Sequence, residues 1–175
     1  ITVGESVLDP ADPRPLPPLR VDPPTLTMTF MVNDSPFAGR EGVYVTSRHL
    51  KARLERETEH NVGLVVEEMD QPDRWRVSGR GELHLSILIE TMRREGYELA
   101  VSRPEVIWQE TDGQRLEPIE ELVADLPDEH VGSVLESLGR RRAELQQMSP
   151  LGAGRSRLVA LVPARGLIGF AGEFA

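Results

Sequence analysis

The order of apolar patterns between residues 25 and 103 restricts the fold more than any other feature of the sequence. Alternating apolar residues predict four strands, and two longer segments with helical apolar spacing predict helices. The strands are expected at 26–32, 62–68, 74–79 and 97–101, and the helices at about 47–60 and 82–95. This βαββαβ order is that of the split βαβ, or ferredoxin-like, arrangement. We therefore expect an α+β, ferredoxin-like domain over residues 24–103.

Residues 104–175 repeat most of this order without obvious sequence identity to the first domain. Strands are predicted at 117–126, near 143–148 and at 157–162, with helices at 128–141 and 164–175. The order is βαββα. We therefore expect a second, consecutive ferredoxin-like domain over residues 104–175 that lacks its last strand.

The first 23 residues differ in character from the rest. Residues 1–9 predict one short strand, and the stretch PADPRPLPPLRVDPP at 10–24 contains seven prolines. Proline lacks an N–H donor and fixes φ, so such a stretch favours an extended linker over a packed element. No methionine begins the chain, so we interpret residues 1–23 as the end of a preceding domain and a linker within a longer protein.

Composition narrows the classes of function. The 175 residues include no cysteine, which excludes disulfides, thiolate metal sites and a cysteine nucleophile. The 20 basic and 29 acidic residues give a net charge of −9, so general nucleic-acid binding is disfavoured and any RNA contact needs local basic patches. Apolar runs are far shorter than the roughly 18–20 residues of a membrane span. We expect a cytoplasmic protein with no membrane contact.

The stretch VSGRGELHLSILIETMRREG at 77–96 has features of both a binding site and a turn. Glycines before a helix can expose N–H groups to an anion, but the lysine and hydroxyl residue of a P-loop and the third glycine of a dinucleotide fingerprint are absent. We predict that Gly79 and Gly81 form a tight turn between strand and helix. Glu82 and His84 are two residues apart and point in different directions on a helix, so no metal site is expected.

The helix at 82–95 has two apolar surfaces. Leu83 and Ile87 lie on one side, and we expect them to contact a neighbouring domain. The residues predicted to pack on the sheet follow the i, i+3, i+4, i+7 spacing and are Leu85, Leu88, Ile89 and Met92.

Positive charge gathers at three places that could contact RNA phosphates. The candidates are Arg140, Arg141 and Arg142 at a helix C-terminus, Arg165 at the start of the last helix, Arg40 in the loop at 33–42, and Arg48 and Lys51 on the helix that follows. Each place has an ordinary explanation too. Cations favour helix C-termini, and basic residues on exposed helix faces are commonly only solvated.

Several long strings resemble the BipA/TypA family of ribosome-associated translational GTPases, which are similar to elongation factor G. They are PTLTMTFMVNDSPFAGREG, VSGRGELHLSILIETMRREGYEL, SRPEVIW, LEPIEELVADLP, LGRRRAEL and PARGLIGF. The resemblance implies that residues 24–103 correspond to domain III and residues 104–175 to an incomplete domain V. Residues 1–9 would be the end of the β-barrel of domain II.

The resemblance also implies a function for the parent protein. A GTP-binding domain using GTP and Mg²⁺ would lie upstream, and the family's own C-terminal domain would lie downstream. None of the nucleotide motifs occurs in this sequence, so we expect no catalytic, cofactor or metal residue in it. The implied role is ribosome binding, with the 70S ribosome as partner, in translation regulation or ribosome assembly under stress.

Two other classes fit the same fold. A stand-alone ferredoxin-like RNA-binding module would stack bases on sheet aromatics, but the RNP1 pattern is absent and aromatic residues make up 5% of the chain. An acylphosphatase-type hydrolase would need an anion-binding loop after the first strand. The loop at 33–42, with Asn33 and Arg40, stands at that place without the acylphosphatase pattern.

Overall fold

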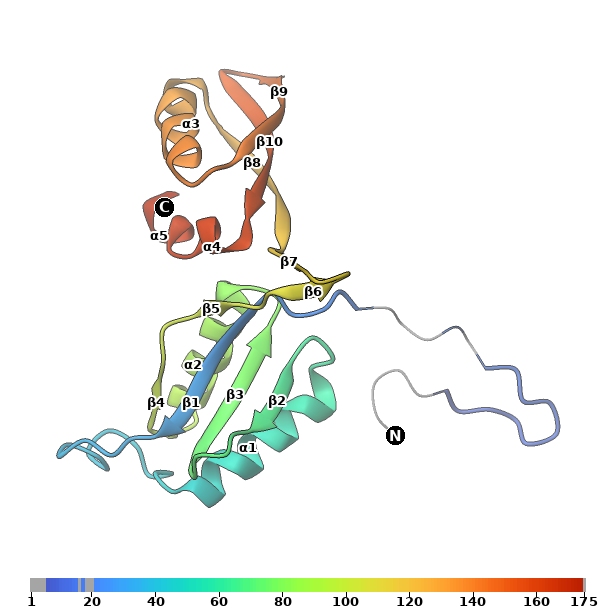
Figure 1. The fold of residues 1–175 in the computed structure, drawn as a ribbon, viewed down its shortest axis with the longest axis vertical. Coiled ribbons are helices and arrows are strands. Elements are labelled where there is room, and N and C mark those ends of the chain that lie inside the picture. The colour runs from blue at the N-terminus through green and yellow to red at the C-terminus, as the bar shows by residue number, and fades with distance from the viewer. Residues whose placement is uncertain (1–5, 16, 18–20, 175) are drawn as a thin grey trace. The chain divides into compact units, whose positions relative to one another are not determined.

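The computed structural model describes residues 6–15, 17 and 21–174 (Figure 1). The chain divides into two compact units, Ile1–Arg103 and Pro104–Ala175, called unit 1 and unit 2 below.

The strand predicted at residues 1–9 is not found where it can be observed. Residues 1–5 lie outside the described residues, and residues 6–8 have no regular structure. Asp9 forms only an isolated bridge with Asp12. A strand needs a neighbour for its backbone groups, and within the described residues no strand pairs with this segment. The prediction is therefore wrong for residues 6–9.

Unit 1 contains an antiparallel sheet with the strand order β2-β3-β1-β4 and two helices. This is the order expected of a ferredoxin-like domain, so the predicted α+β fold class is confirmed. The elements are β1 (Leu26–Val32), α1 (Ser47–His60), β2 (Val65–Glu68), β3 (Arg74–Gly79), α2 (Glu82–Arg94) and β4 (Leu99–Val101).

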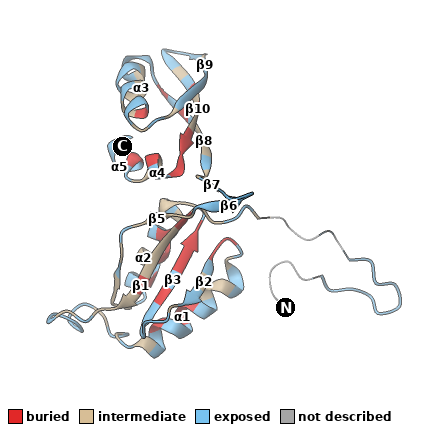
Figure 2. Cartoon of the chain, in the orientation of Figure 1, coloured by how far each residue is buried: buried red, intermediate tan, exposed pale blue. Residues whose placement is uncertain are grey.

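The core of unit 1 follows from the period of two along β1 and β3. The register pairs Phe30 with Trp75 and Met28 with Val77, which places these side chains on one face of the sheet. Phe30 and Val77 are fully buried, and the helices pack their apolar sides against this face (Figure 2). Burying each such large side chain contributes about 1.5–3 kcal/mol. The buried apolar residues of α1 and α2 are Leu50, Leu54, Leu85, Leu88 and Met92.

The turn before α2 brings the helix close to the sheet, as predicted for its glycines. A Cβ atom at Gly79 would lie 2.9 Å from Leu85 Cδ2 and 3.0 Å from His84 Nδ1. Leu85 is fully buried and has no room to move aside. A Cβ at Gly81 would meet nothing within 4 Å, so only Gly79 is required by close packing.

Unit 2 contains a three-stranded antiparallel sheet in the order β8-β10-β9. Its core consists of two clusters: Leu138, Ala160, Val162 and Phe170 form one, and Ala124, Leu126 and Leu158 form the other. The elements of residues 104–174 are β5 (Glu105–Val106), β6 (Gln109–Thr111), β7 (Gln114–Leu116), β8 (Ile119–Pro127), η1 (Asp128–His130), α3 (Val131–Arg140), β9 (Glu144–Gly152), β10 (Arg155–Pro163), α4 (Ala164–Leu167) and α5 (Phe170–Phe174).

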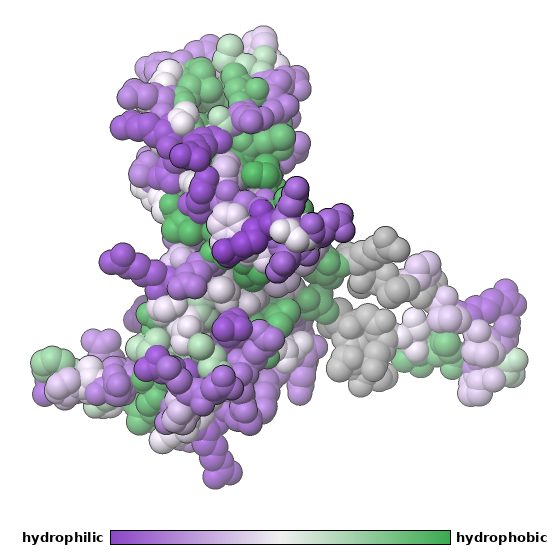
Figure 3. All heavy atoms as spheres, viewed as in Figure 1, coloured by the Kyte–Doolittle hydropathy of each residue, from purple (hydrophilic) through white to green (hydrophobic). Residues whose placement is uncertain are grey.

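Some apolar side chains of unit 2 remain at its surface. Ile119 and Val123 of β8 and Leu145 and Met148 of β9 are each about half exposed. Figure 3 shows hydrophobic atoms of this unit at the surface among hydrophilic ones. The two core clusters therefore do not cover all the apolar area of its strands.

Besides the short strand β5, two features of unit 2 differ from the sequence prediction. The helix predicted at 164–175 is two short helices, because Ile168 is extended and Gly169 has a φ of +74°, in the left-handed region. The hairpin β6–β7 was not predicted. Its turn is Asp112-Gly113, with φ values of 52° and 75°, and Asp-Gly is a favoured pair for such two-residue turns.

None of the helices in the described part of the chain is long and apolar enough to cross a membrane.

Candidate functional site

The three consecutive arginines at the end of α3 do not form one exposed cluster. Arg141 is directed inward, and its side chain is only 17% exposed. Its Nη1 donates to the carbonyl oxygens of Gly166 at 2.6 Å and Ile168 at 3.1 Å, and its Nη2 pairs with Glu173 at 2.6 Å. The guanidinium also lies 5.4 Å from the ring centroid of Phe170. Arg141 therefore holds α4 and α5 onto the end of α3.

The neighbours of Arg141 are exposed. The side chain of Arg140 is 74% exposed and lies 3.6 Å from Glu136 one turn earlier, which is a weak surface pair. Arg142 is exposed and has a φ of +62°. This left-handed residue follows Arg141, the C-cap of α3, which is a common way for a helix to end.

Arg165 at the start of α4 is partly committed to a carboxylate. Its Nε lies 3.1 Å from Oε1 of Glu117, whose side chain is 15% exposed. The contact is too poorly aligned to count as a hydrogen bond, and Oε1 of Glu117 has no other hydrogen-bond partner in the described structure. Arg165 thus compensates the largely buried charge of Glu117, while 43% of the Arg165 side chain remains exposed.

In unit 1, the loop that carries Arg40 is organised around the carboxylate of Glu98. Asn33 Nδ2 donates to it at 2.7 Å, and the backbone N–H groups of Gly39, Glu41 and Gly42 donate at 2.9, 3.1 and 3.1 Å. The backbone bonds from Gly39 and Glu41 are the main reason why the pKa of Glu98 is lowered.

The tip of this loop presents an aromatic side chain and a cation to solvent. Phe37 is 63% exposed, and the guanidinium of Arg40 lies 4.9 Å from its ring centroid. Such a pair is favourable by about 0.5–1 kcal/mol at an exposed position. The base of the loop is tight, because a Cβ at Gly42 would lie 2.7–2.9 Å from Glu98 Cβ, Glu98 N and Gly96 O.

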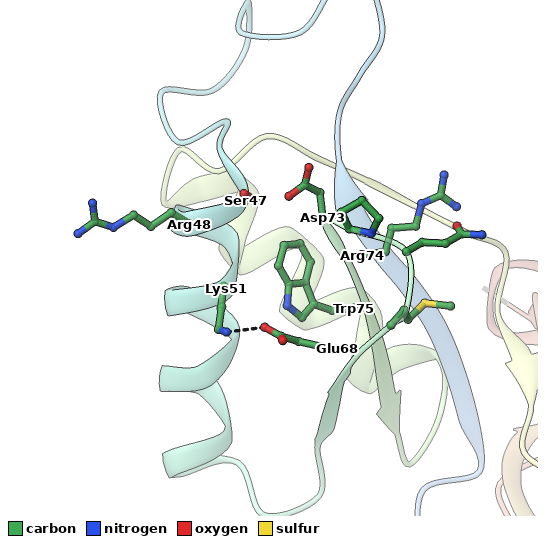
Figure 4. A pocket seen from close by; sticks show the side chains of 10 residues that line it. Ser47, Arg48, Lys51, Glu68, Asp73, Arg74 and Trp75 are labelled. Atoms are coloured by element: carbon green, nitrogen blue, oxygen red, sulfur yellow. Dashed lines mark ion pairs between the residues drawn. The ribbon is translucent and has the colours of Figure 1, made fainter.

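Arg48 and Lys51 lie on the first turns of α1, which the Thr46 hydroxyl caps by accepting from the N–H of His49. Arg48 is exposed. Lys51 Nζ lies 2.5 Å from Oε1 of Glu68, and this hydrogen bond raises the pKa of Lys51. Figure 4 shows Lys51 and Glu68 at the mouth of a pocket, with the side chain of Arg48 pointing away from it.

An ion network joins α1 to the end of α2. Arg53 is 5% exposed, its Nε donates to Glu95 at 2.5 Å, and its Nη1 donates to Glu57 at 2.8 Å. Burial alone would raise the pKa of Glu57, but the hydrogen bonds from Arg53 and Asn61 outweigh it and lower that pKa. The i, i+4 spacing of Arg53 and Glu57 in the sequence indicates that they can pair on one helix. No local spacing indicates the pair between Arg53 and Glu95.

The network continues to His84, which is a structural residue. The backbone N–H of Arg80 donates to His84 Nδ1 at 3.3 Å, and His84 Nε2 lies 2.9 Å from Nδ2 and 3.1 Å from Oδ1 of the Asn61 amide. With Nδ1 accepting, the neutral ring carries its hydrogen on Nε2 and donates it to Oδ1. The amide of Asn61 donates in turn to Glu57. Burial lowers the pKa of His84, the Arg80 charge lowers it further, and Glu57 opposes both.

This lowered pKa predicts an acid-dependent loss of stability. The unfolded chain, with an ordinary histidine pKa of about 6.5, binds a proton more readily than the folded chain, so stability falls as the pH drops below about 6.5. Urea midpoints at pH 7.5 and 5.5 measure the difference. We expect His84→Gln to reduce it, and the exposed His60→Gln control to leave it unchanged. An equal pH dependence in His84→Gln and the unmodified chain would contradict the assignment.

The second apolar surface predicted for α2 is exposed. Leu83 is 72% exposed and Ile87 57% exposed, one helical turn apart. No group of three or more histidine, aspartate or glutamate side chains in the described part of the chain is placed to hold a metal ion.

Comparisons with known proteins agree along almost the whole chain. The family described as "Elongation factor G C-terminus" matches residues 114–175, which is most of unit 2. Proteins named "Large ribosomal subunit assembly factor BipA" from Bacillus subtilis strain 168 and Haemophilus influenzae are 58% and 56% identical over 99% of this chain. The one from Salmonella typhimurium is 53% identical over 99% of it.

A solved protein from Thermus thermophilus aligns with 89% of this chain and 38% of its own, at 16% identity and a TM-score of 0.49. The curated relatives are much longer than this chain, which spans 28–29% of their length. With this identity maintained over 99% of its residues, the chain belongs to the BipA family as one segment of such a protein.

Proposed function

We propose that this chain is a ribosome-binding segment of a BipA-type translational GTPase that acts in ribosome assembly or translation control under stress. The identity of 53–58% to proteins named as large ribosomal subunit assembly factors carries the proposal. Residues 24–103 would serve as domain III and residues 104–175 as part of domain V. GTP and Mg²⁺ would bind a G domain outside this segment, and the segment itself would have no catalytic residue.

The exposed cations are the proposed contacts with ribosomal RNA. Arg140 and Arg142 in unit 2, with the exposed part of Arg165, are the contacts proposed there. In unit 1 they are Arg40 beside Phe37, and Arg48 and Lys51 on α1. Arg141 supports these contacts only indirectly, since its guanidinium is used inside the unit. The acidic remainder of the surface would repel RNA, so binding would be oriented.

Leu83 and Ile87 are the proposed contact with a neighbouring domain of the parent protein. Two adjacent exposed apolar side chains on the solvent side of a helix favour burial against a partner. Through this contact, α2 would connect the ribosome-facing parts to the upstream G domain.

The geometry of the loop at 33–42 argues against the acylphosphatase alternative. Its backbone N–H groups do converge on one anion, but that anion is the carboxylate of Glu98. A substrate phosphate would have to displace a side chain that four donors hold. A stand-alone RNA-binding module finds little support on the outer face of the sheet either. There the register pairs Thr29 with Arg76 and Met31 with Arg74, with no aromatic platform among them.

Co-pelleting with purified 70S ribosomes across a salt series tests the proposal. We expect salt-sensitive pelleting of the chain. The Arg140→Ala/Arg142→Ala variant should bind roughly tenfold more weakly, with a salt slope lower by about 1–2, because two phosphate contacts are lost. Arg93→Ala/Arg94→Ala, on α2, removes the same charge outside the proposed contacts and should bind as the unmodified chain does. Absence of pelleting at low salt would overturn the proposal for this segment.

A further inference from the structure

A pocket of about 320 Å³ lies between the first turns of α1 and the turn that joins β2 to β3 (Figure 4). Ser47, Arg48 and Lys51 of α1 line one side, and Glu68 and Trp75 line the other. Its volume is at the lower end of the range for small-molecule sites, which suits a ligand of mononucleotide size.

Trp75 supplies an unused hydrogen-bond donor at this pocket. The residue is 5% exposed, and its indole Nε1 has no hydrogen-bond partner among the described residues. In Figure 4 the indole lies beside α1 and next to the Lys51–Glu68 ion pair, with its nitrogen toward that pair. The N–H is close enough to Glu68 to add to the effect of Lys51 in lowering the pKa of that carboxylate, but it is not aligned for a hydrogen bond. Buried donors without a partner are rare, and one explanation is an acceptor that binds from outside the chain.

A cation and a helix N-terminus favour an anion as that acceptor. Lys51 lines the pocket beside the carboxylates Glu68 and Asp73, and Figure 4 shows the guanidinium groups of Arg48 and Arg74 directed away from Trp75. The N-terminus of α1, a helix of 14 residues, adds partial positive charge. The Thr46 cap uses the N–H of His49, and the N–H groups of the first helical residues have no partner within the helix.

The carboxylate of Glu68 lies where a bound anion would contact Lys51 and the indole N–H. Its carboxylate lies on Lys51 and next to the indole N–H, yet its side chain is 60% exposed. Being so exposed, it can turn to solvent at little cost when a stronger acceptor arrives. A phosphate offers three or four acceptor oxygens, compared with the two of a carboxylate, and can accept from several donors at once.

We propose that this pocket binds the phosphate group of a phosphate ester, with Lys51 Nζ and Trp75 Nε1 donating to its oxygens in place of the Glu68 carboxylate. The first N–H groups of α1 complete the donor set. The ester is either a free mononucleotide or the backbone of an RNA strand. Binding of the free ester does not depend on the proposed ribosome contact.

The test follows the indole group directly in the full 175-residue chain. The sequence has two tryptophans, so Trp108→Phe leaves the indole N–H of Trp75 as a single ¹H–¹⁵N cross-peak. The titrants are inorganic phosphate, uridine monophosphate and a short RNA oligonucleotide, each at constant ionic strength. We expect a saturable downfield shift of this cross-peak, as the N–H acquires an acceptor.

Matched variants locate the site. Lys51→Met should weaken binding at least tenfold, and Glu68→Gln should strengthen it at least threefold by removing the competing carboxylate. Arg56→Met changes a cation on the same helix outside the pocket and should bind as the Trp108→Phe parent does. The backbone amide spectrum shows whether each variant is folded.

The outcomes separate the two sources of phosphate. Saturation by the mononucleotide identifies a free-ester site, and saturation by the oligonucleotide alone identifies an RNA-backbone site. The inference is overturned if no phosphate compound saturates the shift, or if chloride at equal ionic strength reproduces it. Equal binding by folded Lys51→Met overturns it as well. Because ribosomes are absent from this experiment, its failure leaves the proposed ribosome binding untouched.

Discussion

Replacement of Arg141 by alanine is expected to destabilise unit 2 by about 2–4 kcal/mol. The change removes charge-assisted hydrogen bonds to the carbonyls of Gly166 and Ile168 and an ion pair with Glu173. Hydrogen bonds to charged groups contribute about 1.5–3 kcal/mol each when largely shielded from water. The side chain also packs against Phe170, so the loss includes apolar contact.

Urea unfolding of the full chain, followed by circular dichroism, measures this effect, and the adjacent arginines are its controls. Arg140→Ala and Arg142→Ala should change stability by no more than about 0.5 kcal/mol, because both side chains are at the surface. In ribosome pelleting, Arg140→Ala and Arg142→Ala should instead lose more binding than Arg141→Ala does. A destabilisation by Arg140→Ala equal to that by Arg141→Ala would contradict the inward assignment.

Replacement of Arg53 by methionine is expected to destabilise unit 1 by about 2–4 kcal/mol. The aliphatic part of the site remains filled, but Glu57 and Glu95 lose their common partner. Removing one member of a buried ion pair costs about 3–5 kcal/mol, and the value here is lower because Glu95 is 37% exposed and can be hydrated.

A double-mutant cycle separates charge pairing from packing. The coupling energy between Arg53→Met and Glu95→Gln should be about 1–3 kcal/mol, since the two side chains share two hydrogen bonds. Arg56→Met is the control, because its contact with Glu95 is 3.8 Å long and its side chain is 59% exposed. Additive effects of Arg53→Met and Glu95→Gln would show that the buried pair contributes no specific interaction.

The sheet-forming segments of unit 1 could be predicted because their signal is local. The alternation in residues 26–32 and the helical spacing of Leu85, Leu88 and Met92 are set by which residues reach the core. The same holds for β10. The hairpin β6–β7 also has a local signal, Asp112-Gly113, but its strands are short and exposed, so they lack the apolar alternation that predicts a strand.

The roles of charged residues could not be read locally. The three arginines at 140–142 have the same charge, but the turn after α3 directs Arg141 inward and leaves its neighbours exposed. The partner of Arg53 is 42 residues away, and the donors to Glu98 are 56–65 residues away. These contacts depend on strand order, which places distant segments side by side, and no spacing rule within one segment reports them.

The loop after β1 is ordered around a carboxylate of the same chain, that of Glu98. In thermodynamic terms, Glu98 is present at a high effective concentration because the chain itself tethers it beside Asn33 and the loop N–H groups. A loop ordered by a dissolved anion would loosen on dilution. Because Glu98 belongs to the same chain, its binding to the loop does not depend on the concentration of a dissolved anion. The lowered pKa of Glu98 extends the order of the loop to more acid conditions than an ordinary glutamate would allow. The tip of the loop, with Phe37 and Arg40, is therefore already ordered before a partner binds. Association then need not include the entropic cost of ordering the loop.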